Sequence, residues 1–238
     1  MAKHVKLYHS RWHLFFTSLL VIVPFVFLLL FAQISKIAAS LLFYDIGISL
    51  LRIFIAYAIS ALLGWFFAIS FYKGRRSLIA LPFFDVLQSF PTYAALPLAV
   101  LYWGASNFTV IFFLVLAIIW PIFFSIISSL KMIRRDWEEA VQISGLSGRT
   151  YLQFFLMPIS IPGLITGSII GLGDGWEALV ATEIIVGVKN GLGGFFQSYS
   201  TNTETTILGI LGLLLIIFAI NKLVWLPLLD RSHRLTVE

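Results

Sequence analysis

The sequence of 238 residues contains no cysteine and little charge. The absence of cysteine excludes disulfide bridges, thiolate metal sites and a cysteine nucleophile. Charged residues make up 11% of the chain and hydrophobic residues 60%, whereas ordinary globular proteins have about 25% charged residues. Since there are too few polar side chains to cover a soluble particle of this size, the composition excludes a soluble globular protein.

Long uncharged runs take the place of the missing charge. They cover residues 14–35, 53–72, 86–130 and 150–173, and about 20 helical residues span the ~30 Å hydrocarbon layer of a membrane. We therefore predict an all-α, polytopic membrane protein with about six transmembrane helices. Their expected ranges are 12–34, 46–72, 78–103, 107–130, 159–188 and 206–229. The turn inside the 86–130 run is expected at 104–107, whose composition favours a tight reversal.

These helices are expected to form a single transmembrane domain over 1–238. Its core would cover 46–229, with 12–34 as an extra N-terminal helix. No internal repeat of the kind that marks many secondary transporters is found. The four histidines lie near the chain ends, where no buried metal cluster is easily assembled, and no metal site is predicted.

The basic residues are unevenly distributed between the predicted loops. With six crossings, one side would hold twelve of the sixteen Lys and Arg: Lys3, Lys6, Arg11, Lys73, Arg75, Arg76, Lys131, Arg134, Arg135, Arg149, Arg231 and Arg234. The other side keeps Lys36 and Lys189. Because cytoplasmic loops carry the excess of Lys and Arg, we predict both termini in the cytoplasm of a prokaryotic cell, with the chain in the inner membrane. The net charge of +5 then reflects topology, and nucleic-acid binding is not needed to explain it.

The longest polar segment, 131–158, would face the cytoplasm. Asp136 with Glu139 three residues later is a capping-box pattern, which predicts a helix start. Gly145 can take the left-handed conformation that ends this helix. A second short helix is expected near Ser147, and Pro158 is expected to interrupt it and redirect the chain into the next span. The segment would thus be a helix-turn-helix below the membrane.

Two interpretations of this segment are open from composition alone. It would either lie on the lipid headgroups or bind a protein. Glu138 and Glu139 would be repelled by anionic lipid, and helices at the membrane surface usually present Lys and Arg. A protein partner is therefore favoured.

The same segment resembles the EAA loop of ATP-binding-cassette importer permeases, E-A-A-x3-G-x9-I-x-L-P. The matching residues, all at the motif's spacing, are Glu139, Ala140, Gly145 and Pro158. The remaining motif positions hold other apolar residues, which are Val141, Phe155 and Met157.

Residues around the loop make the resemblance more specific. From about 46 to 200 the chain is similar to the branch of these permeases that imports nitrate, taurine, alkanesulfonates and related small anions. The shared features are Ser49-Leu50-x-Arg52, Pro91 to Pro97 with Trp103-Gly104, Pro162-Gly163, Gly167, Trp176, Leu179-Val180-Ala181 and Glu183.

This resemblance implies a permease subunit of an ATP-driven importer. It would pair with a second permease subunit, identical or related, and receive solute from an extracytoplasmic substrate-binding protein. Two ATPase subunits would dock on the loop, where Glu139 anchors, Gly145 permits the reversal and Pro158 sets the angle of the fifth span. ATP and Mg would be bound by these partners and no cofactor by this chain, which lacks G-x-x-x-x-G-K-[ST] and is not expected to be an enzyme.

Ionisable residues inside predicted spans indicate candidate pathway or gate residues, because such groups are costly in a membrane. With Trp176 they are Arg52, Asp174, Glu177 and Glu183. On an ideal helix Asp174 and Glu177 share a face, while Glu183 lies half a turn from Asp174. Glu183 is expected to be tied to a neighbouring helix, and Arg52 to be interfacial or structural. The glycines of 167–175 predict an irregular fifth span.

The charge of this span leaves the solute open, since two carboxylates would oppose an anion unless Arg52 or a backbone dipole offsets them. The alternative function is a gradient-driven carrier or channel without an ATPase, with Asp174 and Glu177 as its ion site. An intramembrane hydrolase is a third class, but it needs a nucleophile with a partnered base, and the sequence shows no such pair. Phe195, Phe196 and Tyr199 are expected to form an external lip that docks a binding protein or anchors at the headgroups.

Overall fold

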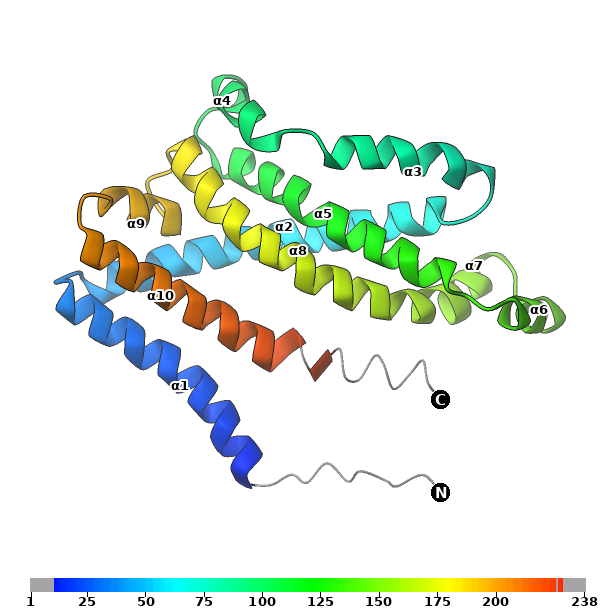
Figure 1. Ribbon diagram of the computed structural model, residues 1–238, viewed down its shortest axis with the longest axis horizontal. Helices are drawn as coiled ribbons and strands as arrows, with labels where there is room; N and C mark the ends of the chain where they lie inside the picture. Colours follow the sequence, from blue (N-terminus) through cyan, green and yellow to red (C-terminus); the bar gives the residue numbers. More distant parts are fainter. Residues whose placement is uncertain (1–10, 226, 229–238) are drawn as a thin grey trace.

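All regular structure in the computed structural model, which describes residues 11–225, 227 and 228, is helical (Figure 1). The long helices are α1 (Arg11–Ile34), α2 (Ala39–Phe71), α5 (Asn107–Lys131), α8 (Met157–Val186) and α10 (Thr203–Ile220). The shorter ones are α3 (Arg75–Gln88), α4 (Thr92–Trp103), α6 (Arg135–Ile143), α7 (Gly148–Tyr151) and α9 (Leu192–Ser198). Two π-helical stretches are η1 (Leu152–Leu156) and η2 (Asn221–Trp225). The predictions that involve Lys3, Lys6, Arg231, Arg234 and the last residues of the sixth span fall outside the described residues.

Four helical stretches are long and apolar enough to cross a membrane: Ala39–Phe71, Asn107–Lys131, Gly148–Val186 and Thr203–Trp225. The pair α3 and α4 would make a fifth span, and the apolar part of α1, Ser18–Ile34, is shorter. Each predicted span therefore coincides with helix, and the all-α membrane class is confirmed. The second span begins earlier than predicted, at Ala39 instead of 46.

The third predicted span is not one helix. Between α3 and α4 the chain bends by 77°. Phe90 precedes Pro91, and a proline ring disfavours helical geometry in the residue before it. Residues 78–103 thus form a broken element whose two parts lie above α5 in Figure 1.

The centre of the bundle is the contact between α5 and α8, with α2 against α5. Ile118, Ile122 and Ile126 of α5 are fully buried. Gly167 of α8 lies so close that a Cβ atom there would be 2.6 Å from the Cα of Ile122. The expected irregularity of the fifth span is wrong, since α8 is continuous to Val186. Four of its glycines, Gly163, Gly167, Gly171 and Gly175, lie against α5 and permit close packing while the backbone ladder stays helical.

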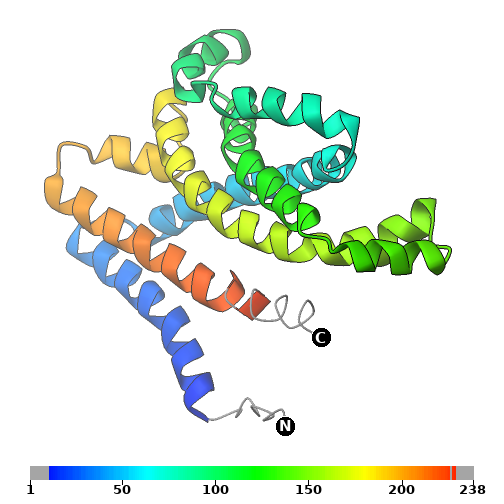
Figure 2. The same ribbon diagram turned by 45° about the vertical axis from the view of Figure 1, so that its right-hand side comes forward.

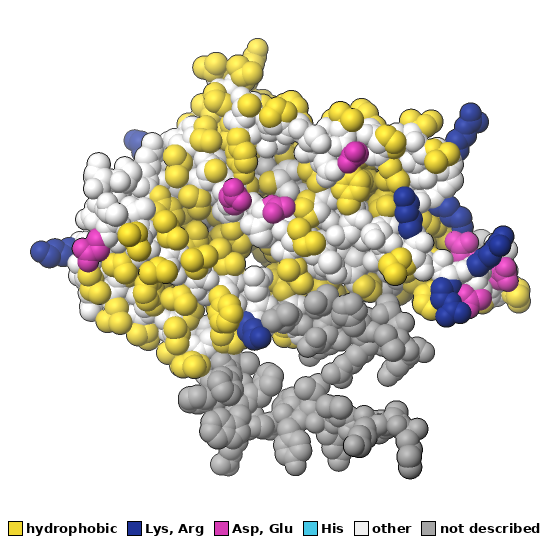
Figure 3. Space-filling model, in the orientation of Figure 1, with side chains coloured by type: hydrophobic (Ala, Val, Ile, Leu, Met, Phe, Trp, Pro, Cys, Tyr) yellow, Lys and Arg dark blue, Asp and Glu magenta, His cyan; other side chains and the backbone are white. Residues whose placement is uncertain are grey.

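The surface along the bundle is largely apolar, apart from a few acidic side chains, and the basic side chains lie mostly at one end. Leu51, Phe54 and Leu62 of α2 are exposed, whereas Ser49 and Arg52 of the same helix are buried. Such a pattern, apolar outside and polar inside, is typical of a helix bundle in lipid. Most Lys and Arg side chains on the face in Figure 3 gather where α6 and α7 lie, which we call the basic end. The opposite end carries α4 and α9 (Figure 1). Lys36 lies in the connection between α1 and α2, and Lys189 in the connection between α8 and α9.

Candidate functional site

Helices α6 and α7 form a hairpin that projects beyond the rest of the bundle at the basic end (Figure 2). The predicted helix-turn-helix is confirmed, but Asp136 is not its cap. The N-cap is Arg134, and α6 begins at Arg135. The Asp136 carboxylate instead accepts hydrogen bonds from Arg134, with Nη2 at 2.7 Å from Oδ2, so it is engaged by the guanidinium and not by backbone N–H groups.

The turn of the hairpin rests on Gly145, which has a φ of 73°. This left-handed conformation is the one expected from the sequence, and other residues adopt it only at a cost. The second arm begins after Ser147, whose backbone N–H donates to the Thr150 hydroxyl at 3.3 Å.

The second arm does not end at Pro158. Helix α7 continues through η1 into α8 as one stretch, Gly148–Val186, with Pro158 in the first turn of α8. The expected interruption is wrong because the wider π-helical turns of Leu152–Leu156 precede the proline, and π-bulges are one way a helix adapts to a break in its hydrogen-bond ladder. The hairpin is therefore joined directly, with no loop between them, to the helix at the centre of the bundle.

The outer surface of the hairpin is available for a partner. Glu139, Ala140 and Phe154 are exposed, and Ile143 is 88% exposed, the highest value among the large hydrophobic side chains described.

The base of the hairpin is tied to the end of α2. Lys73 forms an ion pair with Glu138, with Nζ at 2.6 Å from Oε1. The hydroxyls of Tyr72 and Tyr151 lie 3.2 Å apart. Burial, and then the hydrogen bond with Tyr151, raise the pKa of Tyr72 above its ordinary value, so its hydroxyl stays neutral.

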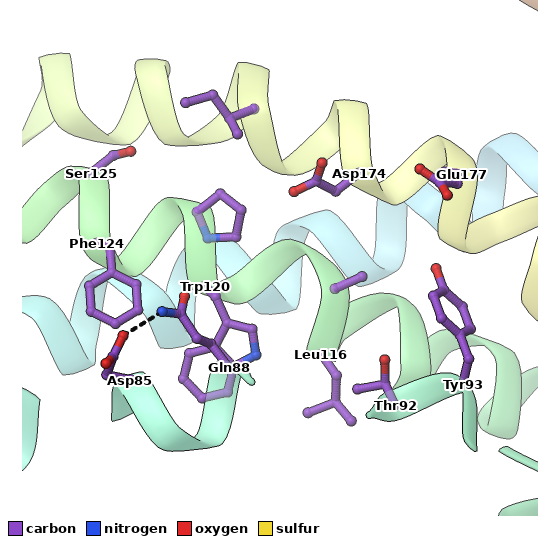
Figure 4. Close-up of a pocket in the computed structure, with 13 residues that line it drawn as sticks. Asp85, Gln88, Thr92, Tyr93, Leu116, Trp120, Phe124, Ser125, Asp174 and Glu177 are labelled. Atoms are coloured by element: carbon purple, nitrogen blue, oxygen red, sulfur yellow. Dashed lines mark hydrogen bonds between the residues drawn. The ribbon is translucent and has the colours of Figure 1, made fainter. Parts of the chain in front are cut away.

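A groove of about 620 Å³ runs between α3 and α4, α5 and α8 (Figure 4). Among the described residues, three carboxylates line it, from Asp85, Asp174 and Glu177, and no Lys or Arg does. In Figure 4, Asp174 and Glu177 of α8 point into the groove, and the Tyr93 hydroxyl of α4 is directed toward Glu177. Asp174 and Glu177 share a face as expected. Asp85, near the end of α3, also lines the groove and accepts a hydrogen bond from Gln88 at 2.7 Å.

Trp176 lies on another face of α8. It is 7% exposed and lines two apolar cavities, one against α9 and α10 and one against α2 and η2. Glu177 reaches the first of these cavities as well as the groove.

Arg52 and Glu183 meet in the bundle interior near the opposite end. Their ion pair has Nη1 at 2.5 Å from Oε1, and both side chains are buried. Glu183 also accepts hydrogen bonds from the Ser49 hydroxyl at 2.8 and 3.0 Å. Arg52 donates to the side chain of Asn107 at 2.7 and 3.0 Å and to the carbonyl oxygen of Asn190 at 2.8 Å. Glu183 is thus tied to a neighbouring helix, as expected, and Arg52 has a structural position, which was one of the two expectations for it. Arg52 does not line the groove.

The same network holds the start of α9. Its backbone donors bond to side chains of α2 and α8: Gly191 N to Asp45 at 2.8 Å, Leu192 N to Ser49 at 2.8 Å and Gly193 N to Glu183 at 2.7 Å. Sequence reasoning did not predict the roles of Asp45, Asn107 and the glycines of 191–194. The one available signal was that run of glycines, since glycine permits close approach of backbone to other groups.

The expected lip at this end is wrong. Phe195 and Phe196 are buried in the core, where Phe195 contacts Phe31 of α1 edge to face. The network turns these two rings of α9 inward, and Tyr199 is half-buried beside Phe195.

Residues 60–226 match the family described as "Binding-protein-dependent transport system inner membrane component", and the chain belongs to it. Among its relatives are the nitrate import permease protein NrtB of Leptolyngbya laminosa and the taurine transport system permease protein TauC of Escherichia coli. Identity is 30% for the first, over 73% of this chain and 65% of the relative. For the second it is 32%, over 59% and 51%.

The bicarbonate transport system permease protein CmpB of Synechococcus elongatus is 27% identical, over 73% of this chain and 66% of the relative. The chain thus matches less than two thirds of the length of the nitrate and taurine proteins. The family assignment confirms the resemblance seen in the sequence and places the chain among multi-pass inner-membrane transport components.

Proposed function

We propose that the chain is the permease subunit of an ATP-driven importer and forms part of the path for a small solute. The observation that carries this proposal is the exposed α6–α7 hairpin, whose second arm continues without a break into α8. A partner that moves this hairpin would move the helix that lines the groove. The alternative of a carrier without an ATPase gives the hairpin no purpose.

The proposed partners follow from this arrangement. Two ATPase subunits that bind ATP and Mg would dock on the hairpins of two permease subunits, identical or related. A substrate-binding protein would deliver solute at the opposite end. The excess of Lys and Arg at the basic end supports a cytoplasmic position for this end. ATP hydrolysis would occur in the partners.

Replacement of Gly145 by valine is expected to weaken docking of the ATPase about tenfold. A side chain disfavours the left-handed conformation by about 1–2 kcal/mol, and 1.4 kcal/mol is about a tenfold change in an equilibrium. A Cβ atom at this position meets nothing within 4 Å, so the bundle itself is unaffected. The measurement is the amount of ATPase that co-purifies with the tagged chain in mild detergent.

The matched control is Gly145→Asn, since asparagine tolerates the left-handed conformation. It should retain most of the docking that valine loses. Equal docking by both variants would remove the turn from the mechanism, and purification of the unaltered chain without any ATPase would overturn the proposed function.

The negative charge of the groove indicates which kind of solute suits it. Its carboxylates would repel a simple anion such as nitrate, and Arg52, which could offset them, is engaged by Glu183. We propose that the path along Asp174 and Glu177 suits a small acid that also carries a positive group. Taurine, an aminosulfonate, has this chemistry, since its ammonium group can approach the carboxylates. Other sulfonates and nitrate fit this groove less well.

Glu177→Gln is therefore expected to raise the KM for taurine uptake about tenfold, as for the loss of a hydrogen bond to a charged group worth about 1.5 kcal/mol. Asp174→Asn should act in the same direction. Glu204→Gln is the matched control because Glu204 is an exposed acid on α10, outside the groove. Uptake by vesicles that contain the full transporter is measured with taurine and with nitrate. Improved nitrate uptake without loss of taurine uptake would contradict the proposal that the solute is a small acid that also carries a positive group.

A further inference from the structure

The start of α9 is closely packed against α8. A Cβ atom at Gly191 would lie 2.7 Å from both carboxylate oxygens of Glu183, and one at Gly193 would overlap the Glu183 side chain. Gly191 also has a φ of 114°, which favours glycine. Because the α9 backbone contacts the Glu183 carboxylate directly, α9 cannot shift on α8 unless these hydrogen bonds break.

The Glu183 carboxylate is itself held by hydrogen bonds from several groups. Arg52 and Ser49 fix it from α2, and Asn107 of α5 fixes Arg52 in turn. A buried ion pair is weak grounds for added stability, because desolvation offsets much of the attraction. Its distinct property here is that it joins three long helices to a short helix at the opposite end.

The helix that carries Glu183 begins in the hairpin. The stretch Gly148–Val186 has 39 residues, which at about 1.5 Å per residue is about 58 Å long. A tilt or rotation imposed on α7 at the basic end therefore reaches Glu183 without an intervening break.

We propose that Glu183, held by Arg52, is a positioning residue that holds α9 against the helical stretch Gly148–Val186. Closure of the ATPase subunits would then change the surface that α9 presents. The inference rests on the proposed function for the identity of the ATPase. Gln197 and Ser198 of α9 and the neighbouring Lys189 are exposed, at the end of the bundle where the substrate-binding protein is proposed to deliver solute. Communication between that protein and the ATPase would then run through the Glu183 carboxylate.

The chain contains no cysteine, which permits a direct test. Gln197→Cys is introduced as a single thiol, and its rate of maleimide labelling is measured in nanodiscs with the co-purified ATPase, with ADP and with ATP plus vanadate. We expect the two rates to differ at least about fivefold, the lower range of typical coupling between sites. In the E183Q background the difference should fall below about twofold.

Glu204→Gln, which removes an exposed carboxylate outside the network, should keep the full difference. Assembly of each variant is checked by the amount of bound ATPase, and Ser49→Ala gives the same comparison if E183Q does not assemble. An undiminished response in an assembled network variant, or no response of the thiol in the assembled parent, would overturn this inference alone. Absence of any bound ATPase would overturn the proposed function together with it.

Discussion

Arg52→Met is expected to lower the free energy of unfolding by about 3–5 kcal/mol, because it leaves the Glu183 carboxylate buried without its cation. The side chain of Glu183 is fully buried, and its remaining donors, Ser49 and Gly193, are uncharged. The loss is measured by denaturation in mixed detergent micelles.

Lys73→Met is the matched control, since it breaks the ion pair with Glu138 in which the lysine side chain is 57% exposed. Exposed pairs contribute about 0–1 kcal/mol, so this variant should remain close to the parent. The double variant Arg52→Met with Glu183→Gln should lose less than the sum of the two single losses, because coupled residues are not additive. Strict additivity would contradict the proposed coupling of the two charges.

Gly167→Ala is expected to destabilise the bundle by about 1–3 kcal/mol, the usual cost of forcing extra atoms into a packed core. The added Cβ would lie 2.6 Å from the Cα of Ile122 and 2.8 Å from the carbonyl oxygen of Pro121. Both are backbone atoms of α5, so α5 and α8 must separate. The measurement is again detergent denaturation.

Gly173→Ala on the same helix provides the control. A Cβ atom there meets nothing within 4 Å, and alanine is favoured over glycine inside helices by about 1 kcal/mol. This variant should equal or exceed the parent in stability. If both substitutions have the same effect, close packing of α5 on α8 is not what the glycines provide.

The local backbone conformation was predictable where neighbouring residues in the sequence decide it. The turn at Gly145 and the reversal near Gly104, whose φ is 72°, both follow from a glycine that takes a left-handed conformation. The break in the third span was also encoded locally, in Phe90-Pro91, but the long uncharged run concealed it. The capping role assigned to Asp136 failed because Arg134, two residues away, engages its carboxylate.

Composition and the spacing of charges alone determined that this is an all-helical membrane protein with an exposed polar hairpin. The length of each apolar run and the position of each charge are properties of the sequence itself and do not depend on tertiary contacts. Only the tertiary structure decided which charges meet. Arg52 and Glu183 are 131 residues apart. The sequence does not show whether either side chain faces lipid, the groove or the side chain of the other residue. Their pairing, and the exclusion of Arg52 from the acidic groove, depend on how α2 and α8 rotate about their axes when they pack on α5. That rotation is fixed by interlocking side chains from distant parts of the chain.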